Sequence, residues 1–450
     1  MKTICLYFEM HQNIHLKRYR FFNIGSDHYY YDDYENERSI VETANNSYIP
    51  ALNTLIEMAD ENNGAFKCAI SLSGCSIELL ETHAPQVIGL LIKLVKTGCC
   101  EIVAEPYSHG LASLGSESAF RAEVKHLCEK VEGLFGVKPT VFRNSCSIYS
   151  DDIGRIVYEM GFKAMLTEGA KHVLGWKSPH FVYNCTQAPS LKLLLRDNRL
   201  SEDISFRFAD YNWSEYPLMA DKYMDWIAQL PEDEKLVNLF MELCALGIFQ
   251  PLSSNILDFF KALPGEAKKR DIKFATPSEV CKKMKSVGPI NVTDPISWVD
   301  EERDLSPWLG NVMQQEAYEK LYSIADRVMV CNDRRLQQDW DYLQATNNFR
   351  FMSTKPGAEN SYRGIYDTAD DAFTNYMNIL GDYITRVNNL YPDLENEEIS
   401  PLMMTIRNQE DEINRKDREI AHLQKTLELL KGNSKEKTSR TKTKKTPSKS

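Results

Sequence analysis

Several residues that could carry out chemistry follow directly after short apolar runs in the first 285 residues. Imidazole, carboxyl and thiol groups can transfer protons or attack an electrophile, and guanidinium and amide groups can hold a polar ligand. For any one of these residues, a hydrogen-bonded structural role remains an open interpretation. Their recurrence after four separate runs favours a site. The residues are His11, Gln12, Asn13, Glu105, His109, Arg143, Asn144, Cys146 and Glu242.

The apolar runs are predicted to be parallel strands, because amphipathic stretches of helical length lie between them. This alternation predicts an α/β fold closed into a barrel, whose strand ends converge on one mouth where substrate binds. A doubly wound open sheet has the same alternation, but no G-x-G-x-x-G turn follows the first strand to favour it. The predicted strands are residues 3–8, 67–72, 101–104, 140–142, 163–166, 191–195, 236–241 and 273–275, and the predicted helices are residues 49–62, 85–96, 116–135, 151–160, 219–229 and 252–263.

The chain changes character after the barrel. Strand patterns fade from about residue 308, and helical patterns at 314–327 and 369–389 predict a helical domain packed on the barrel. Residues 347–366, rich in Gly, Asn, Ser and aromatic residues, are predicted to be a loop able to reach over the mouth. The expected division is a barrel (1–285), a helical domain (286–395), a short coiled-coil-like helix (396–431) and a disordered basic tail (432–450).

The coiled-coil prediction depends on Ile and Leu residues spaced seven apart between residues 399 and 430. Gln409 and Lys416 interrupt this register, so the expected zipper is short and weak, and its Ile and Leu positions favour two strands. A helix that lies along its own domain fits the same pattern. A homo-oligomer formed through residues 399–430 is therefore one of two open interpretations.

The net charge of −11 conceals a polarised chain. Residues 431–450 carry eight Lys or Arg and the single acid Glu436, so the rest of the chain has a net charge of −18. An acidic body argues against nucleic acid as the main ligand, because phosphate binding needs a basic face.

Composition also indicates a compartment. No stretch is long and apolar enough to cross a membrane, and residues 1–10 lack the features of a secretory signal. The eleven cysteines include no zinc-type CxxC pair and form no even disulfide framework, which favours a reducing environment. We expect a cytoplasmic protein without a membrane partner.

The segments at the predicted strand ends resemble, in order and spacing, the motifs of glycoside hydrolase family 57, which includes α-amylases. The resemblance extends over roughly residues 1–392. It implies an incomplete seven-stranded (β/α)7 barrel followed by a helical domain, with an α-1,4-glucan or maltooligosaccharide as ligand. It is carried by His11 and Gln12, residues 101–109, 142–144 and 238–241, with further matches at residues 166–169, 174–176, 213–217, 276–279 and 296–305.

Both catalytic positions implied by this resemblance are substituted. The family cleaves glycosides with retention, using a glutamate nucleophile and an aspartic acid/base whose carboxyl groups lie about 5 to 5.5 Å apart. Cys146 occupies the nucleophile position and Glu242 the acid/base position. The motif around Glu242 has also lost polar groups, at Cys244, Ile248 and Phe249.

Cys146 could replace the glutamate only as a thiolate, which needs a nearby cation or a helix N-terminus. Arg143 and the helix predicted to begin near Ser150 could supply these, but a thiolate lacks the second oxygen of a carboxylate. A buried structural cysteine is the other interpretation. Because the loss of a catalytic group typically costs on the order of 10⁴ to 10⁶ in rate, we expect no efficient hydrolysis.

We therefore expect an amylase-like protein that keeps part of a glucan site. The alternatives are an active glycoside hydrolase or glucanotransferase with altered catalytic residues, and an assembly protein acting through its C-terminal coiled coil. No metal or other cofactor is expected, because only His11 and His15 have metal-ligand spacing. The expected sugar contacts are His11, Gln12, Glu105, His109, Arg143, Trp176 and Trp298, the two Trp residues by stacking, with core packing as the alternative for both.

Overall fold

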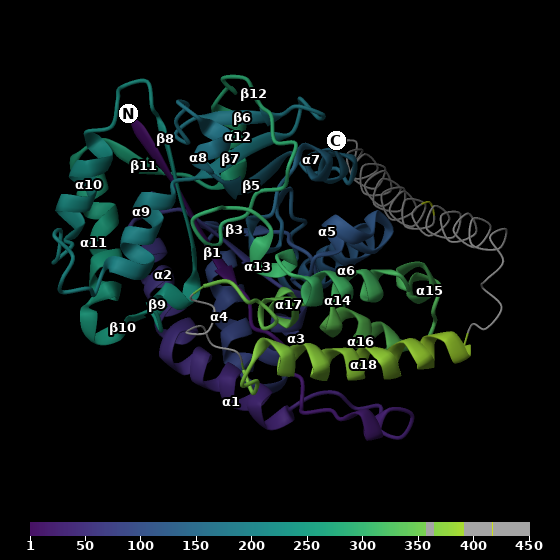
Figure 1. Ribbon diagram of the computed structural model, residues 1–450. Coiled ribbons are helices and arrows are strands. Elements are labelled where there is room, and N and C mark those ends of the chain that lie inside the picture. The colour runs from purple at the N-terminus through teal and green to yellow at the C-terminus, as the bar shows by residue number, and fades with distance from the viewer. Residues whose placement is uncertain (357–363, 391–415, 417–450) are drawn as a thin grey trace, which may run out of the picture. The chain divides into compact units, whose positions relative to one another are not determined.

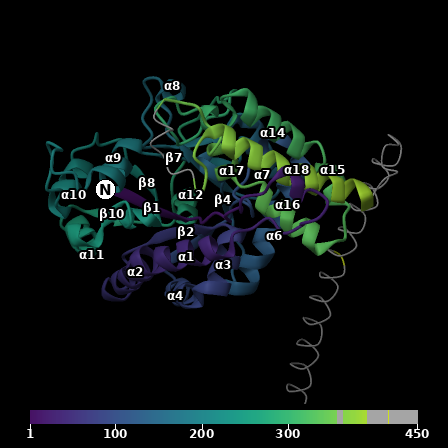
Figure 2. The same ribbon diagram turned by 60° about the horizontal axis from the view of Figure 1, so that its bottom comes forward.

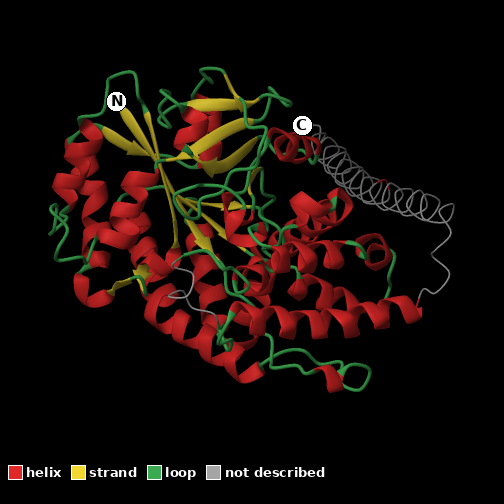
Figure 3. Ribbon diagram, in the orientation of Figure 1, coloured by secondary structure: helices red, strands yellow, loops and turns green. Residues whose placement is uncertain are grey.

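The computed structural model describes residues 1–356, 364–390 and Lys416. Its first part is a barrel of parallel strands (Figures 1 and 3). Parallel pairing joins β1 to β2, β2 to β3, β4 to β5, β5 to β7 and β8 to β1. In order around the barrel the strands are β1 (Lys2–Met10), β2 (Cys68–Leu72), β3 (Cys100–Val103), β4 (Val141–Arg143), β5 (Ala164–Glu168), β7 (Lys192–Arg196) and β8 (Leu236–Glu242).

Individual backbone hydrogen bonds complete this ring of strands. The Ala104 N–H donates to the Val141 carbonyl at 3.0 Å and the Arg143 N–H donates to the Ala104 carbonyl at 2.8 Å, which joins β3 to β4. The Asp197 N–H donates to the Asn238 carbonyl at 2.9 Å, which joins β7 to β8. The predicted (β/α)7 barrel is thereby confirmed.

The barrel encloses an apolar core, which explains why its strands read as apolar runs. Parallel strands covered on both faces bury nearly every side chain, so they lack polar alternation. The interior is filled by Cys5, Tyr7, Ala69, Val103, Val141, Ala164, Leu166, Leu194, Leu236 and Phe240.

In the described part of the chain, five further strands lie outside the ring. β11 (Ile272–Phe274) pairs with the first residues of β1, and β6 (Val182–Cys185) runs antiparallel to β7. The sequence did not predict β6, because its four residues include Asn184 and form no apolar run. The other short strands are β12 (Pro289–Ile290), which pairs with β6, and the pair β9 (Leu246–Gly247) and β10 (Gln250–Pro251).

Helices connect the strands and cover the outside of the barrel. Six of them, α1, α3, α5, α8, α9 and α12, were not predicted. The sequence of α1 is mostly polar and buries only Asn36, Ile40 and Thr43. The helices of this part are α1 (Asp33–Thr43), α2 (Ile49–Glu61), α3 (Gly74–His83), α4 (Pro85–Lys96), α5 (Ala112–Gly115), α6 (Glu117–Phe135), α7 (Asp151–Glu159), α8 (Lys171–Leu174), α9 (Asn198–Glu202), α10 (Ala220–Ala228), α11 (Ile256–Lys269) and α12 (Pro277–Lys283).

A helical region follows the barrel, as predicted. Helices α14 and α15 pack against α5 and α6 of the barrel. Helix α18 runs beside α16 (Figure 2), and its Tyr376 and Tyr383 donate hydrogen bonds to carbonyls of α16. Residues 1–329 and 333–387 form one compact unit. The helices are α13 (Ser306–Leu309), α14 (Val312–Tyr322), α15 (Ala325–Met329), α16 (Arg334–Leu343), α17 (Thr346–Arg350) and α18 (Ala369–Leu390).

The loop predicted for residues 347–366 begins instead as helix α17. The Asn348 side-chain amide donates to the carbonyls of Tyr342 and Leu343, both at 3.2 Å, and the Gln314 amide donates to the Phe349 carbonyl at 3.0 Å. These buried amides satisfy backbone groups, so a segment of loop-like composition forms a helix.

The remaining predictions concern the C-terminal part. Apart from Lys416, the predicted coiled-coil helix (396–431) and basic tail (432–450) lie outside the described residues. Among the helices that the structure describes, none is both long enough and apolar enough to span a bilayer.

Candidate functional site

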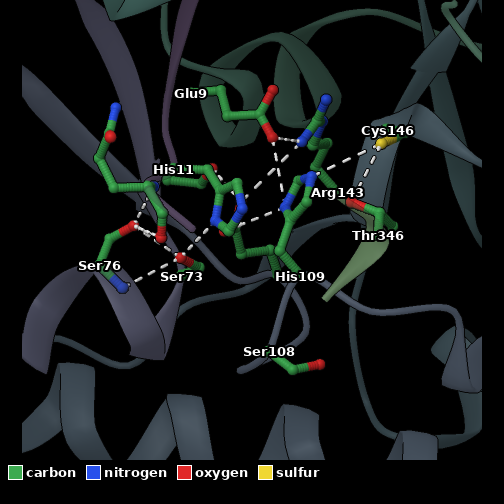
Figure 4. Close-up of polar contacts among 12 residues, drawn as sticks. Glu9, His11, Ser73, Ser76, Ser108, His109, Arg143, Cys146 and Thr346 are labelled. Atoms are coloured by element: carbon green, nitrogen blue, oxygen red, sulfur yellow. Dashed lines mark hydrogen bonds and ion pairs between the residues drawn. The ribbon is translucent and has the colours of Figure 1, made fainter. Parts of the chain in front are cut away.

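A buried ion pair between Glu9 and Arg143 lies at the carboxyl ends of β1 and β4 (Figure 4). Glu105, which follows β3, has one carboxylate oxygen 4.0 Å from the Arg143 guanidinium and accepts a 2.5 Å hydrogen bond from the Ser71 hydroxyl. The exposed fractions of the three charged side chains are only 6%, 3% and 0%. Removal of one partner would leave a buried charge uncompensated, so the three residues hold each other in place.

His109 lies between these carboxylates and the thiol of Cys146. Its Nδ1 is 3.4 Å from Glu9 and 3.7 Å from Glu105, and its Nε2 is 3.6 Å from Cys146 Sγ. Burial alone would lower the pKa of His109, but the charge of Glu9 and the contacts with Cys146 and Glu105 raise this pKa to about 10. The imidazole is therefore protonated at neutral pH.

His11 and Gln12 follow β1 on the other side of His109. The two imidazole rings stack with centroids 4.0 Å apart, and His11 Nδ1 shares a 2.8 Å hydrogen bond with the Ser73 hydroxyl. Burial, followed by the charges of His109 and Arg143, lowers the pKa of His11 well below its usual value. The neutral His11 and the cationic His109 therefore form a mixed pair.

Cys146 lies in the turn between β4 and α7, with a left-handed backbone (φ 51°, ψ 27°). Its thiol is within 3.8 Å of the Thr346 hydroxyl on α17, and its side chain is 8% exposed. The Trp298 N–H donates to the Cys146 carbonyl at 3.1 Å. The helical region therefore contacts the barrel site directly through Thr346, the first residue of α17.

Glu242 ends β8 and pairs in register with Glu9 of β1. Burial and the negative charge of Glu9 raise the pKa of Glu242 to about 7, against the opposing charges of Arg143, His109 and Arg196. Near neutrality this carboxyl group is partly protonated, as a proton donor must be.

Glu9 and Glu242 line a cavity of about 20 Å³ at the mouth. A volume of that size holds roughly one water molecule, and a glucosyl unit does not fit. Phe206 and Phe249, whose rings stack with centroids 5.8 Å apart, narrow it. The lining residues are Tyr7, Glu9, Arg143, Ser147, Arg196, Ser205, Phe206, Phe240, Met241, Glu242, Phe249 and Trp298.

The structure brings together most, though not all, of the predicted sugar-contact residues. Arg143 and Trp298 line the cavity, and the Arg196 guanidinium lies 5.8 Å from the centre of the Trp298 ring. His11, Gln12, Glu105 and His109 lie beside the cavity. His11 and Gln12 are joined through the hydroxyls of Ser73 and Ser76, and the Gln12 N–H donates to the Ser76 hydroxyl at 2.5 Å. Trp176 lies apart, 94% exposed, just after α8.

Sequence reasoning missed Glu9 and Arg196. Glu9 interrupts the apolar run of the first strand. That interruption is itself a signal, because a charged residue in a buried strand needs a partner. Arg196 ends β7 and pairs with Glu168 at 3.1 Å. Its position directly after an apolar run could have identified it by the same criterion that identified Arg143.

The cluster offers ligand atoms that could hold a metal ion. Among the described residues, one ligand atom each from Glu9, Glu105 and His109 lies within 4.8 Å of the others. Arg143, bound to Glu9, already places a positive charge there, which disfavours a second cation. The absence of a metal from the site stays a prediction.

Comparison with known proteins identifies relatives along the sequence. The chain matches the family described as Glycosyl hydrolase family 57 over residues 5–293. It is 36% identical over 370 residues to a protein of Methanocaldococcus jannaschii named "Putative alpha-amylase", which covers 79% of this chain and 78% of that protein.

Solved structures share the fold at low sequence identity. A GH57 branching enzyme of Thermococcus kodakaraensis has a TM-score of 0.62 at 13% identity, covering 86% of this chain and 90% of that chain. The 4-alpha-glucanotransferase of Thermococcus litoralis has a TM-score of 0.60 at 14% identity over 84% of this chain, which spans 59% of that enzyme's length. With the match over residues 5–293 and the 36% identical relative, the chain belongs to glycoside hydrolase family 57.

Proposed function

We propose that this family 57 protein binds α-1,4-glucan or maltooligosaccharides and hydrolyses them poorly. The observation that carries the proposal is the environment of Cys146, the residue at the implied nucleophile position. Its sulfur lies near His109 and Thr346, at 3.6 and 3.8 Å, and it does not line the cavity beside Glu242. A thiol held outside the cavity is poorly placed to attack a sugar bound within it.

The cavity supports the same proposal. A volume of about 20 Å³ means that a sugar enters only if the aromatic pair Phe206 and Phe249 moves aside. Both rings are partly exposed, at 49% and 40%, so their displacement disturbs little of the core. Trp298, on the cavity wall, is then available to stack on a pyranose face.

Calorimetric titration with maltoheptaose tests binding, and a reducing-end assay on maltooligosaccharides tests turnover. We expect measurable heat that falls in Trp298→Ala, with a reducing-end rate at the blank level. Trp176→Ala is the matched control, because this exposed Trp lies apart from the cavity. No heat and no thermal shift with maltoheptaose would refute binding, and a clear release of reducing ends would refute poor hydrolysis.

Restoring the family's residues provides a second test. We expect the double variant Cys146→Glu and Glu242→Asp to remain inactive, because Phe249 and the apolar residues beside it still fill the mouth. Reducing-end release by the double variant at rates well above the blank would show instead that the substitutions at positions 146 and 242 alone abolish hydrolysis.

The protonation of Glu242 favours a second candidate function, glycoside hydrolysis with altered residues. Glu242 has a pKa raised to about 7, and Glu9, in register on the next strand, is paired with Arg143. Two carboxyl groups whose environments differ in this way can divide the roles of acid and base. In this alternative Glu242 protonates the leaving oxygen and Glu9 assists the attack at the sugar.

This second candidate makes a different kinetic prediction. Maltooligosaccharides should then release reducing ends, and both Glu242→Gln and Glu9→Gln should abolish that release. Glu316→Gln, an exposed change on α14, is the control and should leave the rate unchanged. A rate that survives Glu242→Gln would eliminate the Glu242 mechanism.

A further inference from the structure

Cys146 and His109 form a thiol–imidazole pair that neither candidate function uses. The sulfur lies 3.6 Å from His109 Nε2, and the opposite ring nitrogen faces two carboxylates, at 3.4 Å from Glu9 and 3.7 Å from Glu105 (Figure 4). Thiol, imidazole and carboxylate in this sequence are the parts of an activated cysteine nucleophile.

The two carboxylates keep the imidazole charged. The Nδ1 atom of His109 is buried and makes no hydrogen bond to any residue that the structure describes, and the nearby Oε1 atom of Glu105 makes none either. A proton on Nδ1 lies between two negative groups, which stabilises the imidazolium form. The Nε2–H of that imidazolium then points to the sulfur.

The other charges around Cys146 determine whether the thiol ionises. Arg143, 3% exposed, adds a second positive charge that interacts with the sulfur. The negative charges of Glu9 and Glu105 oppose ionisation, but Glu9 is bound to Arg143, and the His109 ring lies between both carboxylates and the sulfur. Thr346 on α17 contributes a neutral hydroxyl. The charged group in direct contact with the sulfur is thus the imidazolium of His109, at 3.6 Å.

The backbone at Cys146 supports a reactive role. The residue has φ 51° and ψ 27°, and its neighbour Ser147 also has a positive φ of 53°. Non-glycine residues rarely adopt this conformation, and such outliers gather at functional sites. The turn directs the Cys146 side chain towards His109 and Thr346.

Access to the thiol is limited to small molecules. Cys146 is 8% exposed, and the residues around it, His109, Arg143 and Thr346, are 4%, 3% and 0% exposed. A sugar or a peptide cannot reach the sulfur through such an opening, but a molecule close to the size of water can.

We propose that Cys146 and His109 form a thiolate–imidazolium pair and that Cys146 is a modification site for small hydroperoxides. The thiolate attacks one peroxide oxygen, a sulfur–oxygen bond forms and the oxygen–oxygen bond breaks. The hydroxide that leaves takes the proton from His109 Nε2 and departs as water. Two electrons pass from sulfur to the peroxide, and Cys146 becomes a sulfenic acid.

Other cysteines of the chain provide internal controls. Burial raises the pKa of Cys128 to about 11 and that of Cys281 to about 12, and both are more exposed than Cys146. Access alone therefore predicts that Cys128 and Cys281 are oxidised first, whereas activation by His109 predicts that Cys146 is.

The experiment treats the reduced full-length protein with hydrogen peroxide at pH 7, removes the peroxide with catalase, and unfolds the protein in denaturant that contains dimedone, so that dimedone reaches every sulfenic acid. Each cysteine peptide is then quantified by mass spectrometry. We expect Cys146 to react at least about tenfold faster than Cys128. His109→Gln should bring Cys146 down to the rate of Cys128, while the exposed His172→Gln leaves both rates unchanged.

A second measurement covers the case in which His109→Gln fails to fold, as judged by circular dichroism. The absorbance at 240 nm of the native protein minus that of Cys146→Ser, followed from pH 5 to 10, reports the thiolate of Cys146 alone. We expect thiolate absorbance to be present at pH 7. Its appearance only above pH about 8.5, the value of a free thiol, or equal oxidation of Cys146 and Cys128, would overturn the proposal.

Discussion

Glu242 and Glu9 are neighbouring carboxyl groups on strands β8 and β1, and their proximity governs the chemistry of the cavity. Burial and the charge of Glu9 raise the pKa of Glu242 to about 7. The folded protein thus resists ionisation of Glu242, which the unfolded chain allows from pH about 4.3 upwards. The ionised form of Glu242 therefore destabilises the fold as the pH rises between these two values.

Glu242→Gln should therefore stabilise the protein in a pH-dependent way. We expect little difference from the native protein at pH 4, and a gain of roughly 1 to 3 kcal/mol in the free energy of unfolding at pH 8. Urea unfolding at the two pH values measures this. The exposed Glu316→Gln is the control, and an equal effect of Glu242→Gln at both pH values would contradict the raised pKa.

The sequence identified individual residues of the site but could not show how their side chains interact. His11, His109, Arg143 and Glu242 follow or end apolar runs. The structure places Arg143 and Glu242 on the cavity wall and stacks the rings of His11 and His109 beside it. The contact of Cys146 with Thr346 joins residues 200 positions apart. No local pattern contains such a contact, because it depends on how the helical region packs on the barrel.

At the scale of elements, His180 joins the end of β7 to the segment that precedes β8, because it bonds to one acidic residue on each side. His180 is bonded through Nε2 to Asp197 at 2.6 Å and through Nδ1 to Glu234 at 2.5 Å. Asp197 also caps α9 by accepting from the Leu200 N–H at 2.8 Å. Burial would lower the pKa of His180, but the two carboxylates raise it above its usual value.

The stabilisation by His180 should be greatest in acid and decline in alkali. Because the pKa is higher in the folded state, the stabilisation is complete below pH about 6.5 and is lost as the pH rises through the folded value. We expect His180→Gln to lower the free energy of unfolding by roughly 1 to 3 kcal/mol at pH 6 and by clearly less at pH 10. Chemical denaturation of both proteins at these two pH values measures the difference, with His172→Gln as control. A cost independent of pH would argue against a charged His180.

Elements with strong apolar patterns were predictable, and elements formed by tertiary contacts were not. The pattern located the barrel strands to within two residues, because burial on both faces requires continuous apolar runs. Helix α17 forms where the composition predicts a loop, since buried amides of Asn348 and Gln314 hold it. Strand β6 is defined by its pairing with β7, which four residues of sequence cannot reveal.

For the molecule as a whole, residues 1–329 and 333–387 form one compact unit that holds the entire site. The family match and the seven strands agree with the predicted barrel, because the order of motifs along a chain reflects the order of strands in the fold. For residues 399–430, which lie outside this unit, we propose that they join two copies of the chain.

Truncation after Leu390 tests that proposal. If residues 399–430 join two copies, the full chain should have about twice the mass of a monomer in solution and the truncated chain the monomer mass. Light scattering after size-exclusion chromatography measures both. The thermal midpoint and the maltoheptaose titration of the truncated chain serve as controls for the barrel. Equal monomer masses for the two chains would rule out the zipper.

The turn at Cys146 and Ser147 has a consequence for protein engineering. Its backbone conformation costs about 1 kcal/mol per residue. Two hydrogen bonds to its carbonyl groups hold it, one of 3.1 Å from the Trp298 N–H to the Cys146 carbonyl and one of 3.1 Å from the Thr167 hydroxyl to the Ser147 carbonyl. None of these bonds involves the thiol. The backbone conformation at position 146 is thus held without the thiol. A library of replacement side chains can therefore be screened at this position without redesigning the loop.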